Sequence, residues 1–150
     1  MGHTFTNLLT HITFSTKERV PCIKGDLGPE LFAYMGGILR EEGARPLLIN
    51  GPADHVHVLA VVPATAALAD VMRVLKTNSS KWVHERWSDR ALFGWQEGYG
   101  AFSVSESNRA AVLEYIARQE QHHHKMTFQE EFVSLLKKHG IEYDERYIWT

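Results

Sequence analysis

The sequence contains a single cysteine, Cys22, and this scarcity excludes several kinds of protein. One thiol can form neither a disulfide within the chain nor a zinc site built on paired cysteines, and it suits a reducing compartment. Long apolar runs are also missing, because the densest apolar stretch, 58–62, stops at Pro63. We therefore expect a cytoplasmic protein with no signal peptide and no membrane partner. Any metal ligand has to come from His, Asp, Glu or Gln.

Charge of one sign is not in excess either. Sixteen Lys and Arg against 18 Asp and Glu leave a net charge of −2, so bulk charge indicates neither a polyanionic partner nor its absence. The chain has 150 residues, 44% apolar and 23% charged, and no internal repeat. This length and composition predict one domain with one core over residues 1–150.

Apolar spacing and turn signals predict an alternating order of strands and helices. Strands are expected at 8–15, 44–50, 54–62 and 101–105, and helices at 27–42, 68–86, 106–121 and 128–139. Two capping boxes, Ser103 with Glu106 and Thr127 with Glu130, mark the starts of the last two helices. The order β-α-β-β-α-β predicts an α+β, ferredoxin-like antiparallel sheet with helices on one face, plus additional C-terminal helices. The other face of the sheet is expected to be free for a ligand or partner.

Two histidines on the strand at 54–62 are separated by one residue. Because side chains two apart on a strand project to the same side, His55 and His57 can close on one ion. The alternative is a pair of structural histidines around a buried valine, and the His-x-His pattern alone does not decide between them. Apolar neighbours on both faces indicate a covered strand, in which histidines need partners. If the first and third strands are neighbours, His11 faces the same side.

Tyr115, Gln119 and His122 lie along one stripe of the third predicted helix. The apolar residues expected on a different side are Ala110, Leu113 and Ala117. Tyr115 could be a core aromatic with its hydroxyl at the rim. Its place away from the apolar set favours a nucleophile beside a metal-bound electrophile, with Gln119 adding a carbonyl oxygen to the metal.

Histidine and basic residues also cluster elsewhere. The run 122–124 is His-His-His, and a solvated helix end, where cationic imidazoles suit the helix dipole, is favoured over a metal tract. Two basic groups can follow a phosphate backbone, although solvated faces carry similar charges. The first group is Lys17, Arg19 and Lys24, and the second is Arg73, Lys76 and Lys81.

The chain resembles the single-tyrosine transposases of the HUH superfamily, which mobilise small insertion sequences of the IS200-like type as single-stranded DNA. The resemblance covers most of the chain and depends on four segments in a fixed order. They are HITFSTK at 11–17, DHVH at 54–57, WQEGYGAFS at 95–103, and EYIARQ at 114–119 followed by two histidines. Their order and spacing together are far more specific than any one segment.

The resemblance implies roles for individual residues. His55 and His57 would be the metal-binding pair, Gln119 the third ligand, and Tyr115 the nucleophile that attacks single-stranded DNA at hairpin-bearing ends. The products would be a 5'-phosphotyrosine and a free 3'-hydroxyl, whose later attack needs no nucleotide cofactor. The family implies Mg²⁺ or Mn²⁺, and Mn²⁺ also suits imidazole ligands.

Members of this family usually act as homodimers in which the tyrosine helix of one subunit serves the histidine pair of the other, so we expect a homodimer. Arg118 stands where relatives often have Asn, and an arginine suits a DNA phosphate. We expect a metal-dependent single-stranded DNA transposase. The alternatives are a domesticated host endonuclease with the same chemistry and a non-catalytic ferredoxin-like nucleic-acid-binding module. Tyr115 and Gln119 on one stripe argue against the binding module.

Overall fold

A four-stranded antiparallel sheet of order β2-β3-β1-β4 forms the centre of the computed structural model, which describes residues 2–119 and 125–150. Its strands are β1 (Leu8–Ser15), β2 (Arg45–Asn50), β3 (His55–Val62) and β4 (Gly100–Ser103). The predicted α+β, ferredoxin-like class is confirmed, because two β-α-β units interleave so that β1 and β3 are central neighbours.

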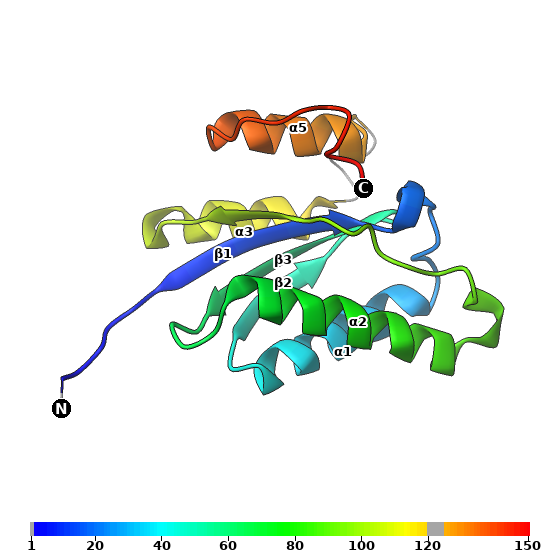
Figure 1. Ribbon diagram of the computed structural model, residues 1–150, viewed down its shortest axis with the longest axis horizontal. Helices are drawn as coiled ribbons and strands as arrows, with labels where there is room; N and C mark the ends of the chain where they lie inside the picture. The colour runs from blue at the N-terminus through cyan, green and yellow to red at the C-terminus, as the bar shows by residue number, and fades with distance from the viewer. Residues whose placement is uncertain (1, 120–124) are drawn as a thin grey trace.

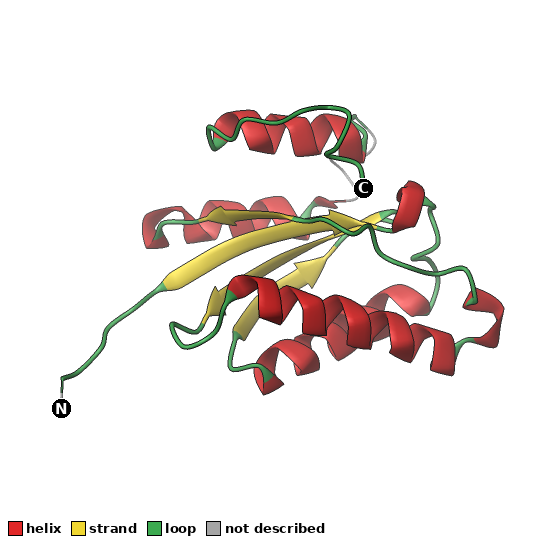
Figure 2. Ribbon diagram, in the orientation of Figure 1, coloured by secondary structure: helices red, strands yellow, loops and turns green. Residues whose placement is uncertain are grey.

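Helices cover both faces of this sheet (Figures 1 and 2). The helices are α1 (Leu27–Glu41), α2 (Leu68–Arg86), α3 (Arg109–Ala117) and α5 (Phe128–Lys138), with short 3-10 turns η1 (Lys17–Arg19), η2 (Ser88–Arg90) and η3 (Glu106–Asn108). Figure 1 shows α1 and α2 on one side of the sheet and α3 and α5 on the other. The expectation of a free second face was therefore wrong. In the described part of the chain, no helix is both long and apolar enough to cross a membrane.

The main core lies between the sheet and the α1–α2 layer. Alternate residues of the central strands, including Phe14 and Val58, point into it and are fully buried. From the helices, Leu31, Met35 and Leu75 reach the same cluster and are equally buried. Each such side chain contributes about 1.5–3 kcal/mol through removal from water, so this layer fixes the sheet as a rigid platform.

The second face of the sheet also carries apolar residues, and α3 and α5 cover this face because they pack on them. Leu9 and Leu59 pack with Ile116 of α3. Phe102 of β4 packs with an apolar stripe of α5 that includes Phe132. A Cβ atom on Gly100 would lie 2.8 Å from Cε2 of Phe132, so α5 approaches β4 as closely as a glycine allows.

The two predicted helix starts have different outcomes. At Thr127 the capping box is confirmed: the amide of Glu130 donates to Oγ1 of Thr127 (3.2 Å), and the amide of Thr127 donates to Oε1 of Glu130 (3.3 Å). The box expected at Ser103 is not formed, because Glu106 accepts hydrogen bonds from Asn7 and Arg109 instead. The third helix accordingly begins three residues late, after η3, and α3 ends at Ala117. The histidine run 122–124 lies outside the described residues.

Candidate metal centre and nucleophile

The pairing of β1 with β3 brings three histidines together on the sheet face covered by α3 and α5. In this register Ser15 is opposite His55 and Thr13 is opposite His57, so His11 lies diagonally across from His57. Nε2 of His11 is 2.8 Å from Nδ1 of His57. The expectation that His11 faces the same side as the pair is confirmed.

A carboxylate from α5 closes the group. Oε1 of Glu131 lies 3.1 Å from Nε2 of His55 and 2.9 Å from Nε2 of His57. On its other side, His55 donates from Nδ1 to Oδ1 of Asp54 at 2.7 Å. Both histidines are fully buried and Glu131 is 1% exposed, so these polar groups depend on one another for hydrogen bonds.

Glu131 is not among the site residues predicted from the sequence, although its position in the sequence indicates burial. The residue stands three positions after Phe128 and four before Leu135, and is therefore within the apolar stripe of α5. An acidic residue within such a stripe is seldom buried unless it is paired. The pairing itself arises only because α5 folds back over β4.

The hydroxyl of Tyr115 donates to the second carboxylate oxygen of Glu131. Nε2 of Gln119 is 3.4 Å from the same Oε2, and Gln119 is fully buried. The tyrosine ring centroid is 5.9 Å from that of His57. Tyr115, the two histidines and Gln119, predicted from separate segments, therefore converge on one carboxylate.

The orientation expected for α3 needs correction. Ile116 is the buried residue of this helix, whereas Ala110 and Ala117 are exposed. Tyr115 is partly buried and packs against the cluster of Leu9, Leu59 and Ile116. The tyrosine therefore lies on the side of α3 that faces the sheet, together with the apolar residues. Packing of the ring thus holds the hydroxyl in place.

Burial and neighbouring charges act differently on the ionisable groups. Burial alone lowers the pKa of His55, but its hydrogen bonds to Asp54 and Glu131 outweigh this and raise the pKa above 6.5. For His11, burial and the neighbouring His57 lower the pKa to about 3, so its ring is neutral. Burial, together with the hydrogen bond to Glu131, raises the pKa of the Tyr115 phenol. The tyrosine is consequently protonated at neutral pH.

The donor set fits a divalent ion. One ligand atom each from His55, His57 and Glu131 lie within 4.8 Å of one another, and all three residues are buried. Two imidazole nitrogens and a carboxylate oxygen form a mixed set that Mn²⁺ accepts, since imidazole suits the later metals and carboxylate suits Mg²⁺ and Mn²⁺. The negative charge of the carboxylate also compensates the charge that an ion would introduce.

A cavity of about 600 Å³ opens beside this group, between α3 and α5. Tyr115, Glu131 and His11 lie on its inner wall, and Lys138 and His139 contribute basic groups to its lining. The side chains of Tyr115 and Lys138 therefore line the same cavity.

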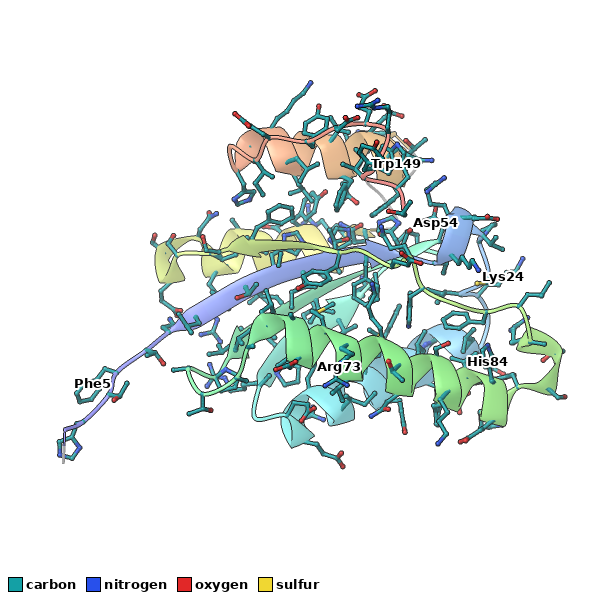
Figure 3. All side chains as sticks on the ribbon, in the orientation of Figure 1. Phe5, Lys24, Asp54, Arg73, His84 and Trp149 are labelled. Atoms are coloured by element: carbon teal, nitrogen blue, oxygen red, sulfur yellow. The ribbon has the colours of Figure 1, made fainter. Side chains whose placement is uncertain are left out.

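The basic residues predicted to contact DNA lie in several places. Arg73 and Lys81 are exposed on α2, in the layer on the opposite side of the sheet from the histidines (Figure 3 labels Arg73 there and Asp54 at the sheet end). Arg118 forms an exposed ion pair with Glu114 at 2.9 Å. Lys17 and Arg19 lie in η1, directly after β1.

Lys76 has a different environment from the one expected. Its ammonium donates to the backbone carbonyls of Gln96 (2.6 Å), Glu97 (2.9 Å) and Gly98 (2.6 Å). The same group lies over the ring of Phe14. Burial lowers its pKa to about 8. Lys76 thus fastens the loop before β4 to α2.

Comparison with known proteins shows the family of the chain. A family model described as IS200-like transposase matches residues 4–119. The chain belongs to the IS200-like transposase family. The transposase for insertion sequence element IS200 of Salmonella typhimurium is 27% identical over 124 residues, which cover 79% of this chain and 81% of that protein. The ISDra2 transposase TnpA of Deinococcus radiodurans is 25% identical over 114 residues, covering 73% and 81%.

Solved structures of transposases have the same fold. A Deinococcus radiodurans R1 protein assigned as a transposase superposes with a TM-score of 0.61 at 22% identity, covering 79% of this chain and 96% of that one. A REP-associated tyrosine transposase bound to a REP hairpin gives 0.60 at 12% identity, covering 82% and 73%. The match to the IS200-like family model ends at Gln119, so α5 and Glu131 lie beyond it.

Proposed function

We propose that this protein cleaves and rejoins single-stranded DNA at hairpin-bearing element ends, with Tyr115 as the nucleophile. The observation that carries the proposal is the convergence of the Tyr115 hydroxyl, His55 and His57 on the carboxylate of Glu131. A phenol, a base and a set of metal ligands in one buried group are what phosphoryl transfer to a tyrosine requires.

Tyr115 and Glu131 have different roles in the proposed reaction. The phenol oxygen of Tyr115 forms a bond to the scissile phosphorus, and the bond from phosphorus to the 3' oxygen breaks. Since the phenol is protonated at neutral pH, its proton has to leave, and Oε2 of Glu131 already accepts it in a hydrogen bond. The leaving 3' oxygen takes a proton to become a free hydroxyl, and attack by this hydroxyl on the phosphotyrosine reverses the step.

His55, His57 and Glu131 would hold the divalent ion, Mg²⁺ or Mn²⁺. When bound, it supplies Lewis-acid polarisation of a phosphoryl oxygen. Gln119, expected as the third ligand, lies beside Glu131 and stays a proposed ligand through its carbonyl oxygen. Asp54 holds His55 from behind, which keeps the Nε2 of that ring directed at Glu131.

Tyr115 and the histidine pair come from one chain. The expected homodimer would consequently contain two groups that are each assembled within a subunit, and no exchange of the tyrosine helix is needed to bring the phenol to the histidines. We keep the homodimer as the proposed assembly.

Basic residues on two sides of the site could contact the phosphates of a DNA strand. Arg19 and Lys125 line a groove beside Asp54, together with the acidic Glu18 and Glu130, and Lys138 and His139 line the cavity beside Tyr115. We infer that the sugar–phosphate backbone passes from the groove to the cavity over the Tyr115 hydroxyl, with Lys17 and Arg118 available to flanking phosphates. Arg73 and Lys81, in the opposite layer, would contact the hairpin stem. Binding of this kind weakens steeply with salt.

The deciding experiment mixes the purified protein with single-stranded hairpin oligonucleotides and Mn²⁺ and looks for a DNA adduct that survives denaturing detergent. We expect the adduct with wild type and none with Tyr115→Phe, which keeps the packed ring and loses only the hydroxyl. His55→Ala should also lose cleavage while keeping the fold.

Other outcomes favour other functions. Hairpin binding by wild type without any adduct would overturn the proposal and favour a non-catalytic nucleic-acid-binding module. An adduct that forms but is never followed by strand joining would favour a domesticated endonuclease. Loss of the fold in His55→Ala would indicate structural histidines.

A further inference from the structure

The imidazole of His11 contacts the ring of His57 on the side away from Glu131, and the proposed reaction does not use it. It is 4% exposed and comes from β1, the strand next to that of His57. His11 is not part of the group of three potential ligands, so its contact is with a ligand and not with the ion.

We propose that His11 is a positioning residue that orients the ring of His57 and thereby sets the affinity of the centre for its ion. The inference rests on the proposed metal centre and adds a residue that supports it. The geometry is direct, because Nδ1 of His57 is 2.8 Å from Nε2 of His11 while Nε2 of His57 is 2.9 Å from Glu131. Each ring nitrogen of His57 therefore has a partner on its own side.

The two histidines of the pair are supported in different ways. Nδ1 of His55 has a carboxylate behind it, Asp54, at 2.7 Å. Nδ1 of His57 has the imidazole of His11 next to it instead. Outer partners of this kind fix the ring orientation of ligating histidines, and their loss costs about 10–100-fold in metal affinity.

An imidazole suits this position because its Nε2 either donates or accepts a hydrogen bond, depending on the tautomer. His11 therefore keeps the contact whether His57 carries its proton on Nδ1 or on Nε2. The rings of Phe102 and Tyr115 face His11 edge-on, at 6.1 and 6.3 Å between centroids, and hold it in place.

The test compares His11→Gln with His11→Asn. With Nε2 of His57 on the ion, its Nδ1 donates, and the amide oxygen of glutamine can accept this bond at about the place of a histidine Nε2. The amide of asparagine lies at about the place of Nδ1 and falls short of His57. His84→Gln is the matched control, because it replaces a histidine of α2, in the layer on the opposite side of the sheet. The measurements are Mn²⁺ affinity by titration calorimetry, nitrogen-15 chemical shifts of the His57 ring in metal-free protein, and urea unfolding.

We expect His11→Asn to lower Mn²⁺ affinity by about 10–100-fold and to shift the Nδ1 signal of His57. His11→Gln should stay within about threefold of wild type with the signal retained, and His84→Gln should change neither the affinity nor the signal. Should His11→Asn fail to fold, His11→Leu takes its place with the same expected loss.

Equal Mn²⁺ affinity in wild type and a folded His11→Asn, or in His11→Leu if that variant replaces it, would overturn the role of His11 and leave the centre intact. An unchanged His57 signal in the variant would have the same meaning. Equal losses in His11→Gln and His11→Asn would overturn it too, because the hydrogen bond would then not be the cause. Wild type that binds no Mn²⁺ would instead overturn the proposed centre.

Discussion

Oε1 of Glu131 lies 2.9 Å from Nε2 of His57, although the two residues are 74 positions apart in the chain. One comes from a central strand and the other from a helix that folds back over the edge strand β4. The second oxygen of the same carboxylate accepts the hydrogen bond of Tyr115. One side chain thus links the Tyr115 hydroxyl to the histidine pair.

Glu131→Gln is expected to weaken Mn²⁺ binding by at least about tenfold, because it removes the only anionic oxygen among the four proposed ligands. The Tyr115 hydroxyl keeps an amide oxygen to bond to, so the fold should be retained. Titration calorimetry measures the affinity, and Glu85→Gln, an exposed change on α2, is the control. If Glu131→Gln binds Mn²⁺ normally while Gln119→Ala does not, the ligand predicted from the sequence is the correct one.

Mn²⁺ affinity should rise with pH across the neutral range. The ion needs an unprotonated Nε2 on His55, and the pKa of this residue is raised because its bonds to Asp54 and Glu131 outweigh the effect of burial. Asp54→Asn replaces the charged acceptor by a neutral amide oxygen and so lowers the pKa of His55, and the affinity profile should move to lower pH. An unchanged profile in Asp54→Asn would contradict this account.

The raised pKa of His55 also affects the free energy of unfolding of the metal-free protein, which should fall as pH rises whereas Mn²⁺ affinity increases. A raised folded-state pKa contributes stability that is complete below the unfolded value of about 6.5 and is lost as pH rises through the folded value. Urea unfolding in the presence of a chelator should show this contribution of His55 decreasing above neutral pH. Asp54→Asn should reduce the decrease.

Gly100→Ala should separate α5 from the sheet. The new Cβ would lie 2.8 Å from Phe132 and 3.0 Å from Phe102, and overpacking of this kind costs about 1–3 kcal/mol. Because Glu131 is on the same helix as Phe132, Mn²⁺ affinity should fall as well. Gly37→Ala in α1, where a Cβ meets nothing within 4 Å, should instead stabilise by about 0.5–1 kcal/mol.

Lys76→Met should lower the free energy of unfolding by about 2–4 kcal/mol, because three carbonyls lose a charged donor. Lys81→Met is the matched control on the same helix. Its side chain is 73% exposed and its ammonium is 3.9 Å from Oε1 of Glu85, so the expected change is below about 0.5 kcal/mol. Urea unfolding measures both, and equal small effects would show that the loop before β4 does not depend on Lys76.

The sheet and most of its helices could be predicted because their signals are local. The β-branched, apolar run within His55–Val62 indicates a strand covered on both faces, and the helical spacing of apolar residues in 68–86 indicates a helix with one buried side. The histidine pair was predictable for the same reason, since two residues of separation on a strand determine a shared face. The capping box at Thr127 likewise fixes a helix start within four residues.

Long-range contacts account for what could not be predicted. Glu131 reaches the histidines only because Phe128 and Phe132 pack on Phe102, and no local spacing encodes that return of the chain. The side of α3 that carries Tyr115 was misjudged because alanines tolerate exposure, so Ala110 and Ala117 do not mark the buried side. The carbonyls that Lys76 binds belong to a loop 20 or more positions away.

Because Glu131 lies on a helix past the segment that the family model matches, the proposed metal centre combines residues from inside and outside that segment. If Glu131 is a ligand, replacing this terminal helix changes the ion preference and the position of the Tyr115 hydroxyl while the central strands stay the same. A chimera that grafts α5 from one relative onto the sheet of another would then inherit its metal selectivity from the donor of the helix.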